Sequence, residues 1–321
     1  MPNSHNPNIS IVIATYNGAA YLREQLDSIA AQTVPVYEII IQDDCSEDET
    51  VAIIQSYSAK LPIKLFQNPE NLGYIRNFES ALSKAQGEFI ALCDQDDLWE
   101  PEKLERLMQT IGTKSLAYAD SMLIDSDGNP MGKTLSEKLR NRFIEASSPL
   151  CFVYDNCISA HAILLRRSLL EHLFPFPKHL YFDAWIGACA ASREGIGYID
   201  EPLVGYRQHA SNTLSIHRKS KRSFLEKLLS KEAKKREEHV SRAAIIGDLL
   251  RISELDETHR SVLMRLQQAH ASFESRWFNL RMFFLLVQYR SLLFAITRRN
   301  PFALAFKKSI GLKLYRFLPF L

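Results

Sequence analysis

The sequence predicts an α/β fold in which a mostly parallel β-sheet is covered by helices. Short apolar runs rich in β-branched residues recur along the N-terminal third, and segments with helical spacing of apolar residues separate them. Each run ends in a polar loop, as expected where parallel strands finish at one edge of a sheet. The 321 residues, 46% hydrophobic and 24% charged, suffice for one large domain and a smaller module.

The predicted elements alternate along this part of the chain. We expect strands at the apolar runs 9–14, 37–42, 63–66 and 88–93. The helices between them are predicted by apolar residues at helical spacing: Tyr21, Leu22, Leu26 and Ile29, then Val51, Ile54 and Tyr57, then residues 75–85. Ser46 or Asp48 is expected to cap the second helix. This β-α-β-α-β-α-β order predicts ligand binding at the carboxyl ends of the strands.

Further elements are predicted beyond the fourth strand. A helix is expected over residues 101–111, with Pro101 as its first residue, and a strand over 116–124. The turn 125–129 leads to a polar stretch, 133–148, which is expected to be a mobile loop over the site.

An acidic loop, Asp94-Gln95-Asp96-Asp97, directly follows the fourth strand. Its carboxylates repel one another unless a cation or a donor-rich ligand compensates. Asp94 and Asp96 alternate along an extended segment, so both can point to one side. Oxygen ligands of this kind suit Mg²⁺ or Mn²⁺, which share them with substrate phosphates. A solvated acidic turn has the same pattern, so the motif alone leaves both interpretations open.

The loops after the first two strands carry groups that a nucleotide needs. Thr15, Tyr16 and Asn17 offer hydroxyls, an aromatic face and an amide, and Asp43 and Asp44 offer acceptors for a base N–H or ribose hydroxyls. Helix capping explains the two aspartates equally well. Neither G-x-G-x-x-G nor G-x-x-x-x-G-K-[ST] occurs, so the sequence supports neither a Rossmann dinucleotide fingerprint nor a P-loop.

Four motifs in order resemble the family 2 glycosyltransferases of GT-A fold. They are I-V-I-A-T-Y-N-G at 11–18, Q-D-D-C-S-E-D-E-T at 42–50, N-L-G at 71–73 and G-E-F-I-A-L-C-D-Q-D-D-L-W at 87–99. The similarity extends over roughly residues 8–215, and the D-Q-D-D-x-W form is similar to a rhamnosyltransferase-like subgroup of surface-polysaccharide assembly. Cys45 departs from the pattern, because the family usually has glycine after the paired aspartates.

This resemblance implies an inverting, metal-dependent glycosyltransferase. The donor would be a UDP- or dTDP-sugar carrying rhamnose, galactose or an N-acetylhexosamine, and the acceptor a lipid-linked saccharide. No Q-x-x-R-W string occurs, which argues against a processive synthase. Asp96 would hold Mn²⁺ or Mg²⁺, with His209 as a second ligand. The donor contacts would be Thr15, Tyr16, Asn17, Asp43, Asp44, Asn71, Arg76, Asp94, Gln95 and Arg207.

Asp183 is the candidate catalytic base. It lies among bulky apolar and aromatic residues, 181–186, at the start of a helix predicted to run through Ala190. Such surroundings raise the pKa of a carboxyl group, as a base that accepts a proton from a sugar hydroxyl requires. Capping of the helix is an equally good interpretation of the residue alone. The resemblance favours catalysis, because the family has its acceptor-activating base at this position.

Two histidines lie near these motifs. His161 belongs to 152–165, which resembles the acceptor-facing segment of the family, but a lone histidine in an apolar run is expected to be a hydrogen-bonded core residue. Arg207 and His209 are two apart in an extended Y-R-Q-H segment, where they can meet a pyrophosphate or the metal. A plain structural role for His209 stays open.

The charge divides the chain into an acidic front and a basic back. Residues 218–321 hold 22 Lys+Arg against 9 Asp+Glu, whereas residues 1–217 hold 17 against 28. We therefore expect a GT-A domain over 1–216 and a basic, amphipathic helical module over 217–321. The module has basic clusters at 219–222 and 234–236. Its most apolar stretch, 277–296, is interrupted by Arg281, Gln288 and Arg290, so it lacks the run of about 18–20 consecutive apolar residues that spans a bilayer.

The role of the helical module has two interpretations. A basic, aromatic-rich helix over 301–321 is typical of membrane-interface segments, and dimerisation or packing explains it equally well. Nucleic acid is not expected as a partner, because no binding motif accompanies the charge.

Cysteine usage and the first residues predict a cytoplasmic protein, and the basic helical module is compatible with a peripheral location at the inner face of the membrane. Five cysteines without C-x-x-C spacing indicate reduced thiols, and residues 1–8 are polar, unlike a signal peptide. Two other classes of protein fit the sequence less well. A sugar-phosphate nucleotidyltransferase needs a glycine-rich phosphate loop near the first strand, which the sequence lacks. A non-catalytic scaffold of the same fold is expected to have lost Asp96 or Asp183, and both are present.

Overall fold

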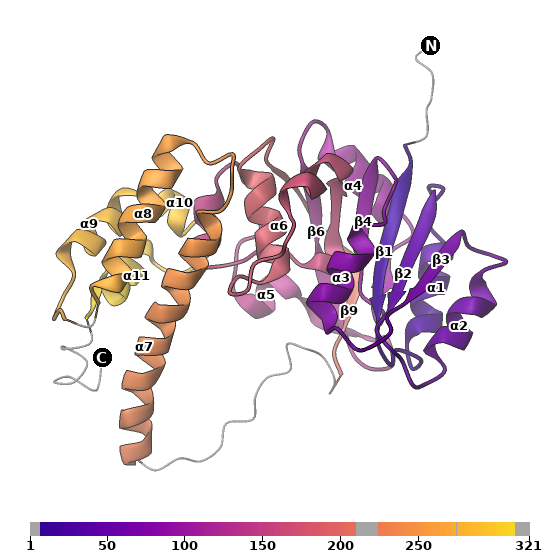
Figure 1. Cartoon of the computed structure of the whole chain (residues 1–321), viewed down its shortest axis with the longest axis horizontal. Helices are drawn as coiled ribbons and strands as arrows, with labels where there is room; N and C mark the ends of the chain where they lie inside the picture. The colour runs from indigo at the N-terminus through magenta and orange to yellow at the C-terminus, as the bar shows by residue number, and fades with distance from the viewer. Residues whose placement is uncertain (1–6, 210–223, 274, 312–321) are drawn as a thin grey trace.

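The computed structural model describes residues 7–209, 224–273 and 275–311 (Figure 1). The strands in these residues are β1 (Ile9–Thr15), β2 (Glu38–Asp43), β3 (Ile63–Gln67), β4 (Phe89–Cys93), β5 (Leu98–Trp99), β6 (Leu116–Ile124), β7 (Pro130–Thr134), β8 (Ile163–Arg166) and β9 (Ile196–Arg207). They form one nine-stranded sheet in the order β3-β2-β1-β4-β8-β6-β9-β5, and β7 pairs with β6.

Helices cover this sheet and continue beyond it. They are α1 (Leu22–Ala30), α2 (Thr50–Tyr57), α3 (Tyr74–Leu82), α4 (Lys103–Ile111), α5 (Leu135–Leu139), α6 (Phe182–Ala191), α7 (Phe224–Leu249), α8 (Glu257–Ala271), α9 (Leu280–Gln288), α10 (Arg290–Leu293) and α11 (Pro301–Ser309). Short 3-10 helices are η1 (Pro149–Val153), η2 (Ala160–Ala162) and η3 (Arg167–His172). The predicted α/β class is confirmed.

The parallel half of the sheet positions the candidate site. β1 pairs in parallel with β2 and with β4, so Ile13 lies beside both Ile41 and Cys93. These strands are buried, and each fully buried Ile contributes roughly 1.5–3 kcal/mol through burial of apolar surface. Because the three strands run in one direction, the polar loops that follow them meet at one edge.

Several antiparallel strands were not predicted. β8 runs antiparallel to both β4 and β6, and the two-residue β5 pairs antiparallel with β9 through Leu98 and Gly205. The expectation of a mobile loop over 133–148 is wrong in its first part. That part contains the end of β7 and the whole of α5, whose N-cap Thr134 forms a capping box with Glu137.

Two expected helix starts differ from the structure. α2 begins at Thr50 with Glu49 as its N-cap residue, so the predicted cap at Ser46 is wrong, whereas the predicted Asp48 does accept from the Thr50 amide at 3.0 Å through Oδ1. The Ser46 hydroxyl instead bonds to the carboxylate of Asp43, which lies in the same turn. α4 begins at Lys103 and not at the predicted Pro101, which lies in the turn before the helix.

Two hydrophobic clusters lie on the sheet. One includes Leu26 of α1, Ile53 of α2 and Leu107 of α4, packed with β1, β2 and β4. The other includes Phe78 of α3 and much of α6, and it continues into the C-terminal helices. The chain is thus packed on both sides of the sheet, as the α/β class requires.

The C-terminal helices pack against the α/β part through the segment around η1. Tyr154 stacks on Phe294 at 5.3 Å and lies 3.2 Å from the His270 imidazole, and Arg242 donates to the carbonyl of Val153. Figure 1 shows α7–α11 gathered at the end of the molecule opposite β1–β3. The division at 216/217 stays a prediction, since that boundary and the cluster 219–222 lie outside the described residues. The expectation of one helix over 301–321 is wrong, because α11 ends at Ser309 and Ile310 has an extended backbone. None of the described helices has both the length and the apolar character to span a bilayer.

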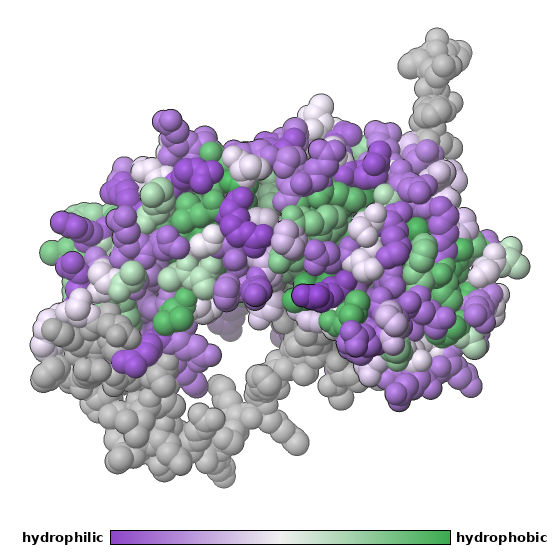
Figure 2. Space-filling view, in the orientation of Figure 1, coloured by the Kyte–Doolittle hydropathy of each residue, from purple (hydrophilic) through white to green (hydrophobic). Residues whose placement is uncertain are grey.

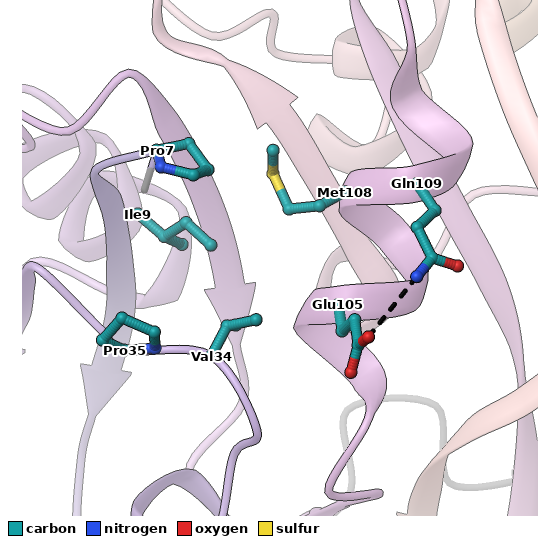
Figure 3. A pocket seen from close by; sticks show the side chains of 7 residues that line it. All are labelled: Pro7, Ile9, Val34, Pro35, Glu105, Met108 and Gln109. Carbon is teal, nitrogen blue, oxygen red and sulfur yellow. Dashed lines mark hydrogen bonds between the residues drawn. The ribbon is translucent and has the colours of Figure 1, made fainter. Parts of the chain in front are cut away.

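An apolar pocket of about 290 Å³ lies at the amino end of β1 (Figure 3). Pro7 and Ile9 line one side, Val34 and Pro35 the floor, and Met108 of α4 the other side. Because Ile9 begins β1 and Thr15 ends it, this pocket is at the strand end opposite the polar loops. It is therefore separate from the candidate site.

Candidate active site

Gln95 joins the acidic loop to the loop after β1. Its Oε1 accepts from the Tyr16 amide at 2.9 Å, and its Nε2 donates to the Tyr16 carbonyl at 3.1 Å. Gly18 leaves the space for this side chain, since a Cβ at Gly18 would lie 2.3 Å from Gln95 Oε1. The Tyr16 ring itself is exposed beside these bonds.

Asp43 holds the turn after β2 instead of facing solvent. Its buried carboxylate accepts from Thr15 Oγ1 at 2.9 Å, from the Ser46 amide at 2.9 Å and from Ser46 Oγ at 2.6 Å. Asn17 is tied to the same turn, because its amide donates to Ser46 Oγ and its Oδ1 accepts from the Glu47 amide, each at 2.9 Å. Thr15 and Asp43 are both expected to contact the nucleotide-sugar donor, but their side chains form hydrogen bonds within the protein.

Asp44 holds the N-L-G turn before α3. Its carboxylate accepts from Asn68 Nδ2 at 2.7 Å and from the Leu72 and Gly73 amides at 2.8 Å. Asn71 Nδ2 donates to the Asp44 carbonyl at 3.2 Å. Neither Asp43 nor Asp44 caps α2, so the capping interpretation is wrong for both. Four of the residues expected to contact the nucleotide-sugar donor have exposed side chains at this edge of the sheet: Tyr16, Asn17, Asn71 and Arg76.

Asp96 and His209 are brought together from distant parts of the chain. His209 Nε2 lies 2.8 Å from Asp96 Oδ2, and the His209 ring packs on Tyr21 at 5.0 Å between centroids. Burial raises the pKa of Asp96, and the like charge of Asp94 raises it further. The two residues expected from the sequence to hold a metal are therefore neighbours.

A second group of potential ligands lies beside them. One donor atom each of Asp94, Asp97 and His161 falls within 4.8 Å of the others. His161 Nδ1 lies 3.4 Å from Asp94 Oδ2 and 3.6 Å from Asp97 Oδ2. Burial raises the pKa of Asp97 to about 7, and Asp97 Oδ2 has no hydrogen-bond partner among the described residues.

Sequence reasoning missed the position of His161. The imidazole is buried, stacks on Tyr206 at 4.6 Å and meets Ser121 Oγ at 2.9 Å through Nε2, as a core residue would. Its Nδ1 nevertheless faces two carboxylates. The apolar neighbours of His161 in the sequence hid this contact. The available signals were the third aspartate of the motif, Asp97, and the resemblance of residues 152–165 to an acceptor-facing segment.

Arg207 does not face the edge where a donor would bind. Its fully buried side chain donates to the Asp96 carbonyl at 2.9 Å, to the Ser126 carbonyl at 2.7 Å and to Glu24 Oε2 at 2.6 Å. The Arg207 amide also donates to Asp97 Oδ1 at 3.0 Å. Arg207 thus supports the acidic loop, and its expected pyrophosphate contact stays a prediction.

Asp183 is the second residue of α6 and is partly buried. The N-cap position belongs to Tyr181, so the alternative of a capping aspartate is wrong. Burial raises the pKa of Asp183 to about 6, although the Ala184 amide, 2.6 Å from Oδ1, and the Asn156 side chain lower it. The charges of His161 and Asp94 act on the same carboxyl group, which links Asp183 to the acidic loop.

These donor groups fit a divalent cation. Carboxylate oxygens of Asp94, Asp96 and Asp97 occur with imidazole nitrogens of His161 and His209, a ligand set that Mn²⁺ accepts readily and Mg²⁺ accepts through its oxygens. Asp97 Oδ2, buried without a hydrogen-bond partner among the described residues, is the kind of atom that a bound cation satisfies. The arrangement suits binding of a charged, oxygen-rich ligand beside a carboxylate base.

Comparison with known proteins identifies the family. The model of glycosyl transferase family 2 matches residues 10–174, which is just over half of the chain. The chain belongs to this family. An uncharacterized glycosyltransferase of Nostoc, alr2836, is 31% identical over 218 residues, 64% of this chain and 66% of that protein. TuaG of Bacillus subtilis, named for teichuronic acid biosynthesis, is 33% identical over 217 residues, 66% of this chain and 73% of its own. The match thus spans about two thirds of these curated relatives.

Solved structures confirm the GT-A fold of this family 2 glycosyltransferase. TarS of S. aureus in complex with UDP-GlcNAc superposes with a TM-score of 0.61 at 20% identity, covering 89% of this chain and 81% of that one. The mannosyltransferase PcManGT of Pyrobaculum calidifontis, in complex with GDP-Man and Mn²⁺, gives a TM-score of 0.53 at 17% identity over 98% and 87%. At these identities the similarity shows the fold alone. The family membership makes the chain a glycosyltransferase.

Proposed function

We propose that this glycosyltransferase moves a sugar from a UDP- or dTDP-sugar to a growing, lipid-linked polysaccharide in one inverting, non-processive step. The observation that carries the proposal is the meeting of Asp96 Oδ2 and His209 Nε2, 2.8 Å apart, beside the carboxyl ends of the parallel strands. The nucleotide-sugars bound by TarS and PcManGT support the donor class. Rhamnose, galactose and N-acetylhexosamine are the candidate sugars.

The nucleotide would lie over the ends of β1, β2 and β4. Tyr16, Asn17, Asn71 and Arg76 expose side chains there, and the partly exposed Asp94 would accept from ribose hydroxyls. Thr15, Asp43 and Asp44 would act indirectly, by fixing the loops that carry these groups, and Gln95 by fixing Tyr16. Preorganised loops of this kind reduce the entropy that binding would otherwise cost.

Mn²⁺ or Mg²⁺, held by Asp96 and His209, would neutralise the negative charge of the departing nucleoside diphosphate. The chain supplies the surroundings that make this binding favourable. Arg207 holds the backbone of Asp96 in place, and His161 holds the neighbouring carboxylates of Asp94 and Asp97 together. Such supporting groups matter to metal affinity, because their mutation commonly weakens a metal site by about 10- to 100-fold.

Asp183 would accept the proton of an acceptor hydroxyl as that oxygen attacks the anomeric carbon. The new glycosidic bond forms on the face opposite the bond to the leaving diphosphate, so configuration inverts. A carboxyl group whose pKa is near 6 is ionised at neutral pH and is still a stronger base than an exposed aspartate. Transfer of the proton to this carboxylate balances the charge that develops on the leaving group.

We also propose a place for the enzyme. Residues 1–216 would form the catalytic domain, and 217–321 a module that holds it at the inner face of the cytoplasmic membrane. The name of TuaG supports a role in cell-surface polymers, of which O-antigen and capsule are the candidates.

The test is thermal stabilisation by UDP, dTDP, GDP and CDP, each with and without Mn²⁺. A ligand that binds the folded state raises the melting temperature. We expect a Mn²⁺-dependent rise with UDP or dTDP that Asp96→Ala abolishes and that Glu171→Ala, the removal of an exposed carboxylate outside the site, retains. Absence of any rise with all four nucleotides would overturn the proposed donor site.

A further inference from the structure

One face of the C-terminal helices exposes large apolar side chains. Leu280 and Phe284 of α9 are 61% and 65% exposed, and Phe302 and Phe306 of α11 are each 51% exposed. Each pair is spaced four residues apart on its helix, so both members lie on one face. Soluble proteins rarely expose adjacent large apolar residues without a partner for them.

Ring contacts bring the helices that carry these side chains together. Phe283 lies 5.7 Å from Phe284 and 6.5 Å from Phe306 between ring centroids, which joins the exposed residues of α9 to those of α11. Trp277, 48% exposed, extends the surface, since its carbonyl accepts from the Gly311 amide next to the end of α11. We name Trp277, Leu280, Phe284, Phe302 and Phe306 the α9–α11 face. In Figure 2 apolar side chains reach the outline of the molecule where Figure 1 places α9.

The chain segment that carries the α9–α11 face has formal charges of one sign. From residue 275 to 321 the sequence has nine Lys and Arg and not one Asp or Glu. Exposed cations among the described residues of this stretch are Arg276, Arg281, Arg290, Arg298, Arg299 and Lys307. Arg290 lies over the Phe302 ring at 4.9 Å, so cations and aromatic rings are interleaved on this surface.

This charge distribution discriminates between occupants. In a symmetric dimer the same surface meets itself, so the cations of one copy would approach those of the other without a carboxylate between them. An anionic lipid bilayer instead offers phosphates to the cations and an acyl boundary to the rings. Basic, aromatic amphipathic surfaces bind in this way, with the apolar side chains inserted below the headgroups.

We propose that the α9–α11 face docks the enzyme on an anionic lipid bilayer. The proposal specifies the surface for the peripheral location given under the proposed function and rests on it for its purpose, access to a lipid-linked acceptor. Its physical basis is independent of the donor site, because none of the residues of the α9–α11 face belongs to that site. The Phe and Leu side chains would provide the apolar anchor, and the surrounding Arg and Lys side chains the preference for anionic headgroups.

The experiment is flotation of the full chain with vesicles, without nucleotide. Vesicles of phosphatidylcholine alone are compared with an equimolar mixture of phosphatidylcholine and phosphatidylglycerol. We expect binding to the anionic vesicles only, weakened by salt. The variant Phe284→Ser/Phe302→Ser should bind at least about tenfold more weakly, and Arg281→Gln/Arg298→Gln/Lys307→Gln should lose about fivefold per cation.

The matched control is Tyr37→Ser/Met131→Ser, which removes two comparably exposed apolar residues from the α/β part. It should bind vesicles as the unmodified chain does. Equal binding by the Phe variant, or no binding to anionic vesicles, would overturn the proposal. A dimer in light scattering that the Phe variant abolishes would overturn it in favour of a second copy.

The experiments distinguish failure of the proposed donor site from failure of the proposed membrane-docking surface. An unchanged melting temperature and an unchanged nucleotide-dependent rise show that a vesicle-binding variant is folded and retains its donor site. Vesicle binding without any nucleotide effect would leave the docking surface standing and remove the proposed donor site. A nucleotide-dependent rise in melting temperature without vesicle binding would support the donor site and remove the proposed docking surface.

Discussion

His209 Nε2 lies 2.8 Å from Asp96 Oδ2, although 113 residues separate them along the chain. The pairing of β5 with β9, through Leu98 and Gly205, accounts for this contact. β5 begins directly after the acidic loop, and β9 ends directly before Gln208 and His209. The pairing of the two-residue β5 with β9 thus places His209, the second predicted metal ligand, next to Asp96, the first.

His209→Ala should weaken Mn²⁺ binding without unfolding the enzyme. Loss of one ligand or of its supporting bond to Asp96 is expected to raise the Mn²⁺ concentration needed for nucleotide stabilisation by about 10- to 100-fold. The measurement is a Mn²⁺ titration of the melting temperature at fixed UDP or dTDP. His179→Ala, which removes a largely exposed imidazole outside the site, is the control. Identical titrations for His209→Ala and the unmodified chain would exclude His209 from the metal site.

Asp183→Asn should abolish most turnover and leave nucleotide binding intact. Asparagine keeps the shape and the hydrogen bond from Ala184 but cannot accept a proton, so kcat is expected to fall by about 100- to 10,000-fold. Single-turnover rates with a sugar donor and acceptor measure this fall. Asp200→Asn changes an exposed carboxylate of β9 and should retain activity. Near-normal turnover by Asp183→Asn would rule out the base.

The raised pKa of Asp183 also predicts two pH dependences. Because burial raises that pKa from 3.8 to about 6, the rate should fall as the pH drops through about 6 and the carboxylate is protonated. The stability effect has the opposite direction. A folded-state pKa above the unfolded value adds stability that is present below pH 3.8 and lost as the pH rises through about 6.

Asp183→Asn should therefore gain stability relative to the unmodified chain as the pH rises from about 5 to about 8. Urea unfolding at the two pH values measures this gain. A constant difference between the two proteins would mean that the carboxyl group titrates normally in the folded state.

The parallel part of the fold was predictable because its information is local. The runs that became β1, β2 and β4 are continuous and β-branched, and each ends in the polar loop where the site lies. Asp96 was found for the same reason. Arg207 was also named from its local motif, but its ion pair with Glu24 was not predictable, because Glu24 is 183 residues away and no local pattern connects them.

Very short strands and the contacts of buried polar atoms could not be predicted from the sequence. Leu98 and Trp99 are too few to show a period, and only pairing with β9 makes them a strand. His161 has the sequence surroundings of a core residue and is one, yet one ring nitrogen reaches the acidic loop. A pattern predicts which face is buried, but not what a buried polar atom meets there.

Cys45→Gly should stabilise the enzyme by about 1 kcal/mol. Cys45 has φ of +69°, a left-handed conformation that costs a residue with a Cβ roughly 1–2 kcal/mol relative to its usual region. The family pattern has glycine at this position, which suits a left-handed backbone. Cys45 departs from the pattern and is strained there. Glycine loses more backbone entropy on folding, which offsets part of the gain. Urea unfolding gives the change in the free energy of unfolding.

The control is Cys45→Ala, which also removes the weak contact of Sγ with the Asn68 carbonyl at 3.6 Å but retains the strained Cβ. It should not stabilise the protein. An equal gain in both variants would show that the thiol, not the backbone, is the cause.

Gln95→Glu should weaken binding of the nucleoside diphosphate by about tenfold, the equivalent of one lost hydrogen bond of about 1.4 kcal/mol. A glutamate can still accept from the Tyr16 amide, but it cannot donate to the Tyr16 carbonyl. It also adds a negative charge beside Asp94 and Asp96. Calorimetric titration with Mn²⁺ and UDP or dTDP measures the affinity.

Gly18→Ala tests the same bonds from the other side. The new Cβ would lie 2.3 Å from Gln95 Oε1 and must displace that side chain, so this variant should weaken binding as Gln95→Glu does. Gln109→Glu makes the same chemical change on α4, at the apolar pocket away from the site, and should bind normally. Normal binding by both Gln95→Glu and Gly18→Ala would mean that the position of Tyr16 does not matter to the donor. Weakening in Gln95→Glu alone would assign the effect to charge.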